Sequence, residues 1–178
     1  MGDFHKQLDE KLIEFIQRQH LFFTGTAPQE GRINVSPKGM DTFRVLSSNQ
    51  CVFLNLTGSG NETAAHVLEN NRITIMFCSF EKQPLILRLY GSAEIIGPDH
   101  SAWQDTLASF PDYPGARQCF LINIDSVQTS CGFGVPLFHE AEERPTLAKW
   151  AENKGEKEIR KYWKEKNSRS IDGLSTDK

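Results

Sequence analysis

Apolar and polar residues follow two different rhythms along this chain. Between residues 6 and 19, Leu8, Leu12, Phe15 and Ile16 recur three or four positions apart among charged residues. This spacing places them on one face of a helix and predicts an amphipathic helix. The helix is expected to pack on the outside of the fold or against a partner subunit.

Beyond residue 20 the rhythm becomes that of strands. The segment 32–36 alternates strictly, so Ile33 and Val35 face one side and the polar residues face the other. Pro37 has no amide hydrogen and is expected to end this strand. Gly91 marks a bulge or bend in a long strand. The other strands are expected at residues 21–26, 43–46, 51–57, 72–80, 85–96 and 120–127.

Helices are expected between and after these strands. They cover residues 59–70, a segment opened by Pro98 that carries Trp103, and residues 146–166 with a break near Gly155. Six or seven short strands without alternating strand–helix–strand units predict a mainly β fold, an antiparallel barrel or sandwich with N- and C-terminal helices packed outside. The pattern divides into a barrel domain at residues 1–140 and a helical extension with a polar tail at residues 141–178.

Composition narrows the class of protein. The 178 residues are 38% hydrophobic and 24% charged, typical of a globular chain that buries a core without disulfides. A net charge of −3 argues against binding along the backbone of a nucleic acid. The chain shows no membrane span, and its first residues do not form a secretory signal, so a cytoplasmic location is expected.

Cysteine and histidine give no sign of a metal centre. The four cysteines, Cys51, Cys78, Cys119 and Cys131, form no C-x-x-C pair, and three of them lie in apolar strand-like runs. They are expected to be reduced, buried and inert. The five histidines are scattered without ligand spacing.

The turn after residue 56 carries the strongest chemical signal. Ser59 and Glu62 have the spacing of a capping box, in which Ser59 would accept from the amide of Glu62 at a helix start. Gly58 and Gly60 allow a ligand to approach the free amides of that start, which favour anions. The turn is therefore either a capped helix end or a phosphate site.

Two further features add positive charge. Arg32, Asn34 and Ser36 form a polar stripe on one strand face with Lys38 just beyond it. Such a stripe is either solvated or lines a pocket. Arg88 lies within an apolar run and needs a partner, which is Glu62, Glu94 or a ligand phosphate.

The order of these segments, with NVSPKG, LTGSGNET, ENNRITIMF and LRLYG in succession, resembles the FMN-binding split barrels of the pyridoxamine 5′-phosphate oxidase-like family over residues 10–135. The resemblance implies a split, Greek-key-like antiparallel β-barrel that forms a homodimer, with FMN at the subunit interface. Arg117 and Gln118 are candidates for contacts from the second subunit.

The resemblance also assigns cofactor-binding residues. Together with the residues selected above, the expected FMN-binding set is Arg32, Asn34, Val35, Ser36, Lys38, Leu56, Thr57, Ser59, Gly60, Asn61, Glu62, Thr63 and Arg88. The chain departs from the oxidases at Glu62 and Thr63, which stand where Arg and Lys are expected, and at Ile86, which stands near an expected Gln. A carboxylate beside a phosphate repels it.

The resemblance implies an FMN-dependent oxidoreductase with a small-molecule substrate. The alternative is a protein of the same fold that binds flavin or haem without turnover, with His20, His66 or His139 as haem ligands. Catalytic residues are not evident, because flavin chemistry belongs largely to the cofactor. His66 follows the glycine turn and is expected to have a structural or surface role.

Overall fold

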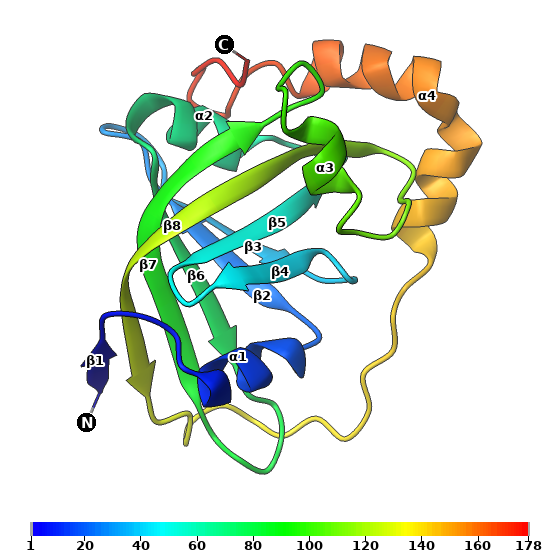
Figure 1. Ribbon diagram of the computed structural model, residues 1–178. Coiled ribbons are helices and arrows are strands. Elements are labelled where there is room, and N and C mark those ends of the chain that lie inside the picture. The colour runs from blue at the N-terminus through cyan, green and yellow to red at the C-terminus, as the bar shows by residue number, and fades with distance from the viewer. Residues whose placement is uncertain (1, 178) are drawn as a thin grey trace.

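The alternating segments build one strongly curved antiparallel sheet of eight strands, shown by a computed structural model that describes residues 2–177 (Figure 1). Its order is β3-β2-β6-β7-β8-β5-β4, and β1 pairs with β8 outside this path. The strands are β1 (Asp3–His5), β2 (Phe22–Thr26), β3 (Asn34–Lys38), β4 (Phe43–Ser47), β5 (Gln50–Leu56), β6 (Arg72–Cys78), β7 (Ile86–Ile96) and β8 (Ala116–Ser130). The expected mainly β fold with outer helices is confirmed, with β1 as an additional strand.

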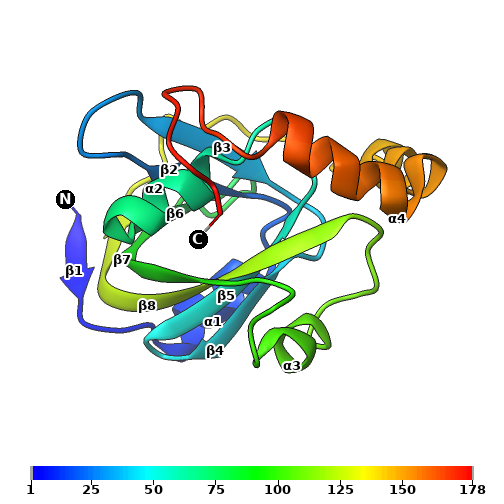
Figure 2. The same cartoon turned by 90° about the horizontal axis from the view of Figure 1, so that it is seen from above.

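The two longest strands, β7 and β8, give the sheet its curvature. β8 pairs with β5 and β7 along its length, and seen from above the sheet curls round without closing (Figure 2). The register of β7 against β8 shifts between Tyr90 and Gly91. The bulge expected at Gly91 is therefore confirmed, and it lets the long strand bend.

Large apolar side chains fill the inside of the curve. Phe53 and Phe120 stack with ring centroids 4.8 Å apart, and Phe22 meets Phe53 edge to face at 5.6 Å. Helix α1 (Glu10–Gln17) adds Leu12, Phe15 and Ile16 from below, as its helical spacing predicted (Figure 1). A second apolar cluster lies outside the sheet, where Trp103 of α3 (Trp103–Leu107) packs near Val52, Leu54 and Cys119.

The cysteines follow the sequence prediction with one exception. Cys51, Cys78 and Cys119 are free thiols buried in the sheet. Cys131 is also free, but it is exposed, so the expectation that all four are buried is wrong. Cys131 directly follows Ser130, the last residue of β8, and thus lies beyond the part of the strand that the core covers.

The edge strand β3 differs from the sequence prediction. It runs from Asn34 to Lys38 and includes Pro37, which was expected to end it. Pro37 lies opposite Phe23 of β2, and β3 has no strand on its other side within the described sheet. An edge strand tolerates proline because a missing donor costs little where no further strand pairs.

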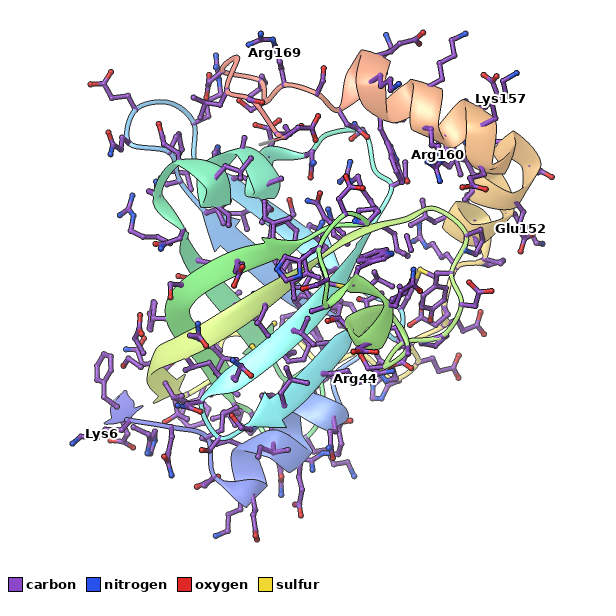
Figure 3. All side chains as sticks on the ribbon, turned by 45° about the horizontal axis from the view of Figure 1, so that its top comes forward. Lys6, Arg44, Glu152, Lys157, Arg160 and Arg169 are labelled. Atoms are coloured by element: carbon purple, nitrogen blue, oxygen red, sulfur yellow. The ribbon has the colours of Figure 1, made fainter. Side chains whose placement is uncertain are left out.

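Two helices, α2 (Glu62–Asn70) and α4 (Thr146–Lys166), lie at the upper end of the curved sheet (Figure 1). Helix α2 begins at Glu62 rather than at Ser59. Helix α4 is broken at Gly155, whose φ is 72°, as the sequence predicted. Its charged residues Glu152, Lys157 and Arg160 are exposed (Figure 3).

After α4 the chain turns back toward α2, and residues 167–177 lie beside the start of that helix (Figures 1 and 2). The division of the chain into residues 1–140 and 141–178 stays a prediction. Among residues 2–177, no helix combines the length and the apolar character needed to cross a bilayer.

The bulge at Gly91 can be tested by adding a single methyl group. A Cβ at Gly91 would lie 2.0 Å from the backbone oxygen of Asn123, so the strands would have to separate. We expect Gly91→Ala to lower the free energy of unfolding by about 3 kcal/mol in urea titrations. Gly97→Ala is the matched control, because a Cβ there meets no described atom within 4 Å, and it should stay within about 0.5 kcal/mol of the parent.

Candidate functional site

Three separate parts of the chain enclose a cavity of about 290 Å³ at the start of α2. They are the polar face of β3, the end of β5 with the turn that follows it, and the start of β8. The cavity is lined by Asn34, Ser36, Pro37, Lys38, Asn55, Gly58, Ser59, Gly60, Asn61, Glu62, Thr63 and Arg117. Most of the residues selected from the sequence therefore lie together.

The polar stripe of β3 is held in place by hydrogen bonds. Asn34 Nδ2 donates to Thr63 Oγ1 at 3.2 Å, and Ser36 Oγ donates to Asn34 Oδ1 at 2.9 Å. Below them, Thr26 Oγ1 shares a 3.0 Å hydrogen bond with Nδ1 of His66, which is only 1% exposed. His66 thus has the structural role expected for it, and Asn34 and Ser36 of the stripe face the cavity, whereas Arg32 does not.

Two cations dominate the electrostatics of the cavity. Burial lowers the pKa of Lys38 to about 8, and the charge of Arg117 contributes to this shift. Burial also lowers the pKa of Arg117 to about 10, against a smaller opposing effect of the Asp177 carboxylate. Arg117 is 6% exposed, and its Nε has no hydrogen-bond partner within residues 2–177. A buried cation with an unmet donor, such as Arg117, favours an anionic ligand.

A network of amides fixes the position of these cations. Lys38 Nζ donates to Asn55 Oδ1 at 3.2 Å. Asn61 Oδ1 accepts from Asn55 Nδ2 at 3.4 Å and from Gln118 Nε2 at 3.2 Å. Arg117 and Gln118, considered from the sequence as contacts to a second subunit, thus lie against the turn of their own chain.

The predicted capping box is wrong. Asn61, not Ser59, is the residue before the helix, and its side chain makes no capping hydrogen bond among the described residues. Ser59 is exposed. The amides of Ala64 and Ala65 donate to the carbonyl oxygen of Asn61 at 3.1 and 3.3 Å. The amides of Glu62 and Thr63, at the very start of α2, are the donors that the helix leaves for the cavity.

Glu62 does not use its carboxylate in the way the sequence suggested. Its two oxygens accept from the backbone amide of Ile171 at 3.0 and 3.1 Å. A carboxylate that accepts an amide hydrogen bond from a neighbouring segment keeps its charge, but its position at the wall is fixed. Glu62 lines the cavity but is already engaged.

Arg88 and Arg32 stand apart from the cavity. Arg88 Nη1 donates to Ser130 Oγ at 3.1 Å, so neither Glu62 nor Glu94 is its hydrogen-bond partner, and it does not line the cavity. Arg32 forms an ion pair with Asp172 and is largely exposed. The interpretation of Arg88 as a partner of these carboxylates is wrong.

Three other selected residues serve the surroundings of the cavity. Val35 is 67% exposed on the opposite face of β3, and Leu56 packs against the apolar cluster beside α3. Thr57 Oγ1 donates to the carbonyl oxygen of Gly115 at 2.8 Å and accepts from Trp163 Nε1 at 2.8 Å. Thr57 thus has a structural role, because it connects the turn to Gly115 and to Trp163 of α4.

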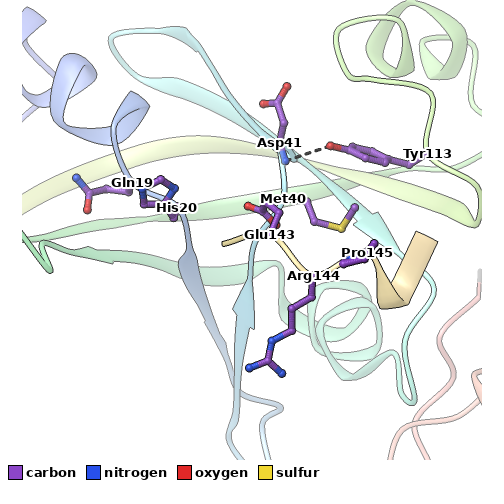
Figure 4. A pocket seen from close by; sticks show the side chains of 8 residues that line it. All are labelled: Gln19, His20, Met40, Asp41, Tyr113, Glu143, Arg144 and Pro145. Carbon is purple, nitrogen blue, oxygen red and sulfur yellow. Dashed lines mark hydrogen bonds between the residues drawn. The ribbon is translucent and has the colours of Figure 1, made fainter. Parts of the chain in front are cut away.

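A second cavity, of about 470 Å³, lies between the end of α1 and residues 143–145 (Figure 4). Its lining includes His20, Met40 and Glu143, and the Asp41 amide donates to the Tyr113 hydroxyl at 3.2 Å. Neither buried polar atom without a partner, Nε of Arg117 or Nε2 of His66, belongs to a residue lining it. Within residues 2–177, no group of three or more His, Cys, Asp or Glu side chains is arranged to hold a metal ion.

Two comparisons of the sequence with known proteins point to the same family. Residues 8–131 match the sequence family described as pyridoxamine 5′-phosphate oxidase. The Aspergillus flavus pyridoxamine 5′-phosphate oxidase family protein ustO is 41% identical over 195 residues, covering 98% of this chain and 77% of the relative.

Solved structures share the fold. HupZ from Group A Streptococcus superposes with a TM-score of 0.54 at 20% identity, covering 67% of this chain and 91% of that one. A Lactobacillus delbrueckii protein named after pyridoxamine 5′-phosphate oxidase gives a TM-score of 0.57 at 22% identity, covering 69% and 94% of the two chains.

The role of Asn61 as the centre of the amide network can be tested against Ser59. Asn61→Ala leaves the buried amide donors of Asn55 and Gln118 without their acceptor, so we expect a loss of about 2 kcal/mol in the free energy of unfolding. Ser59→Ala should change it by less than about 0.5 kcal/mol, because Ser59 is exposed and does not cap α2. A larger loss in the free energy of unfolding for Ser59→Ala would indicate that Ser59 does cap α2.

Proposed function

Because this chain belongs to the pyridoxamine 5′-phosphate oxidase family, we propose that it binds FMN and acts as a flavin-dependent oxidoreductase. The observation that carries the proposal is the pair of cations at one cavity, the partly buried Lys38 and the buried Arg117, beside the first amides of α2. Glu62 is the one carboxylate in the lining, and it is bonded to Ile171.

The residues present fit a phosphate monoester. A phosphate carries close to two negative charges near pH 7 and accepts several hydrogen bonds. Lys38 supplies a point charge, Arg117 supplies the unpartnered Nε donor, and the start of α2 supplies backbone donors. The volume of about 290 Å³ suits this phosphate and part of the attached chain, rather than a whole dinucleotide.

The rest of the cavity supports an orienting role. Asn34 already bonds to both Ser36 and Thr63, so the positions of these side chains are fixed before a ligand arrives. Fixed polar groups hold a ligand in one pose at a small entropic cost. A bound flavin would supply the electron-transfer chemistry, while these residues hold it and Lys38 keeps a proton at Nζ beside its phosphate.

We also propose that two copies of the chain associate, with FMN at their interface. The outer face of β3 supports the association itself, because Val35 on that strand and Ile33 just before it are 67% and 75% exposed. This face is the one turned away from the cavity, so the placement of FMN at the interface rests on the family resemblance alone. Apolar residues gathered on one exposed face favour contact with another protein surface. Sedimentation equilibrium is expected to give twice the 20.2 kDa chain mass, and Val35→Asp is expected to shift it toward a single copy.

The alternative function is a protein of the same fold that binds flavin or haem without catalysing a reaction, and the same experiments test it. Haem binding has less support, because the buried ring of His66 already bonds to Thr26, and His139 is exposed. The three buried cysteines are free, which agrees with a reducing, cytoplasmic location as a further part of the proposal.

The visible spectrum of the purified full chain tests the proposal. Added FMN should bind, with its absorption bleached by NADPH or another reductant and restored by air. Binding without any reaction with reductants would favour the carrier or sensor, and a haem band would replace the flavin. Absence of FMN binding would remove the cofactor assignment.

The lowered pKa of Lys38 predicts a pH dependence. Lys38 of the free protein loses its proton as pH rises through about 8, and the neutral amine no longer attracts the phosphate. FMN affinity, measured by fluorescence titration, should therefore fall about ten-fold between pH 7 and pH 9.5. Lys38→Arg should remove most of this pH dependence, and Lys38→Ala should bind weakly at both pH values. A constant affinity in the parent chain would exclude Lys38 from the site.

A further inference from the structure

The segment after α4 is polar, yet parts of it are buried, and it contacts residues that line the cavity. Asn167 is 2% exposed and Thr176 is also buried. Thr176 Oγ1 donates to the carbonyl oxygen of Asn167 at 2.5 Å, and the Ser170 amide donates to the Leu174 carbonyl at 2.8 Å. These bonds fold residues 167–177 into a closed loop with a defined shape.

This loop is attached on both sides of the proposed phosphate site. On one side Asp172 pairs with Arg32 and also accepts from the Arg32 amide at 2.7 Å, just before β3. On the other side the Ile171 amide donates to both oxygens of Glu62 at the start of α2. The loop therefore ties together the two elements that supply most of the cavity lining.

Asn167 connects the loop to the cation of the cavity. Its Oδ1 accepts from Arg117 Nη1 at 2.8 Å, and its Nδ2 donates to the carbonyl oxygen of Gly58 at 3.3 Å. Arg117 Nη2 donates to the carbonyl oxygen of Gly60 at 3.3 Å. The guanidinium is thus held across the turn by neutral acceptors, which fix its position without cancelling its charge; the Asp177 carboxylate offsets part of that charge from a distance.

We propose, on the basis of the FMN site above, that Asn167 is a positioning residue that makes the site selective for phosphorylated flavin over riboflavin. Asn167 holds Arg117 where the phosphate would lie. The loop 167–177 keeps Asn167 in place, and Glu62 serves as an anchor of that loop.

The chemistry of Glu62 follows from this arrangement. An Arg at position 62 would place a positive charge beside the phosphate, but it could not accept a hydrogen bond from the Ile171 amide. The carboxylate accepts it with both oxygens. The chain therefore places its second cation on β8, through Arg117, and uses position 62 to fasten the loop that orients this cation.

The test compares two ligands that differ only in the phosphate. FMN and riboflavin are titrated against the full chain at pH 7, and the ratio of their affinities reports the phosphate contribution. Asn167→Ala is expected to lower this ratio about ten-fold, with riboflavin affinity unchanged, because Arg117 loses its fixed position. Asn153→Ala, an exposed asparagine on α4, is the matched control and should keep the parent ratio.

A second variant separates position from charge and covers the case in which Asn167→Ala does not fold. Asn167→Asp keeps an oxygen that accepts from Arg117, but its carboxylate neutralises the guanidinium and repels the phosphate. Its ratio should fall at least as far as that of Asn167→Ala, although the contact with Arg117 is kept.

Each outcome has a definite meaning. A fall in the ratio for the Asn167 variants alone supports the inference. An unchanged ratio, or an equal loss of FMN and riboflavin affinity that indicates only a structural role, overturns the inference while the FMN site stands. A parent chain that binds neither ligand overturns the proposed function and the inference with it.

Discussion

The pairing of β8 with both β5 and β7 is the interaction on which the rest of the structure depends. It joins the two halves of the curved sheet and brings Phe53 and Phe120 into stacking contact in the core. The same strand begins next to the turn after β5, because Gln118 pairs with Asn55 across the ladder. One pairing therefore builds the core and places Arg117 at the cavity.

The cost of that placement is electrostatic. Lys38 and Arg117 lose hydration and repel each other, and both pKa values are lowered. Neighbouring amides such as Asn55 and Asn167 hold the two groups without cancelling their charge. Such an arrangement gives up some stability of the free protein, and an anion that binds between the charges restores it.

Apolar runs in the sequence, some of them alternating, were sufficient to predict most strands. Both faces of β5 are apolar, because Val52 and Leu54 pack on the outer side of the sheet near α3. The sequence pattern was insufficient at β3, since the edge position that tolerates Pro37 is set by the sheet as a whole. The capping box failed because Asn61 is recruited by Asn55 and Gln118. The sequence pattern identified Asn34 and Ser36 as polar positions on one strand face. The roles of Arg117 and of residues 167–177 could not be predicted in this way, because they depend on contacts between segments far apart in the chain.

Pro37 has a consequence for how this protein meets its neighbours. β3 is an unpaired edge with exposed Ile33 and Val35 close by, an arrangement that in many sheets invites further strands to add on without limit. Pro37 has no amide hydrogen to offer to an added strand. Growth of the sheet by pairing at this edge is therefore interrupted at Pro37, although the apolar side chains of Ile33 and Val35 stay exposed beside it.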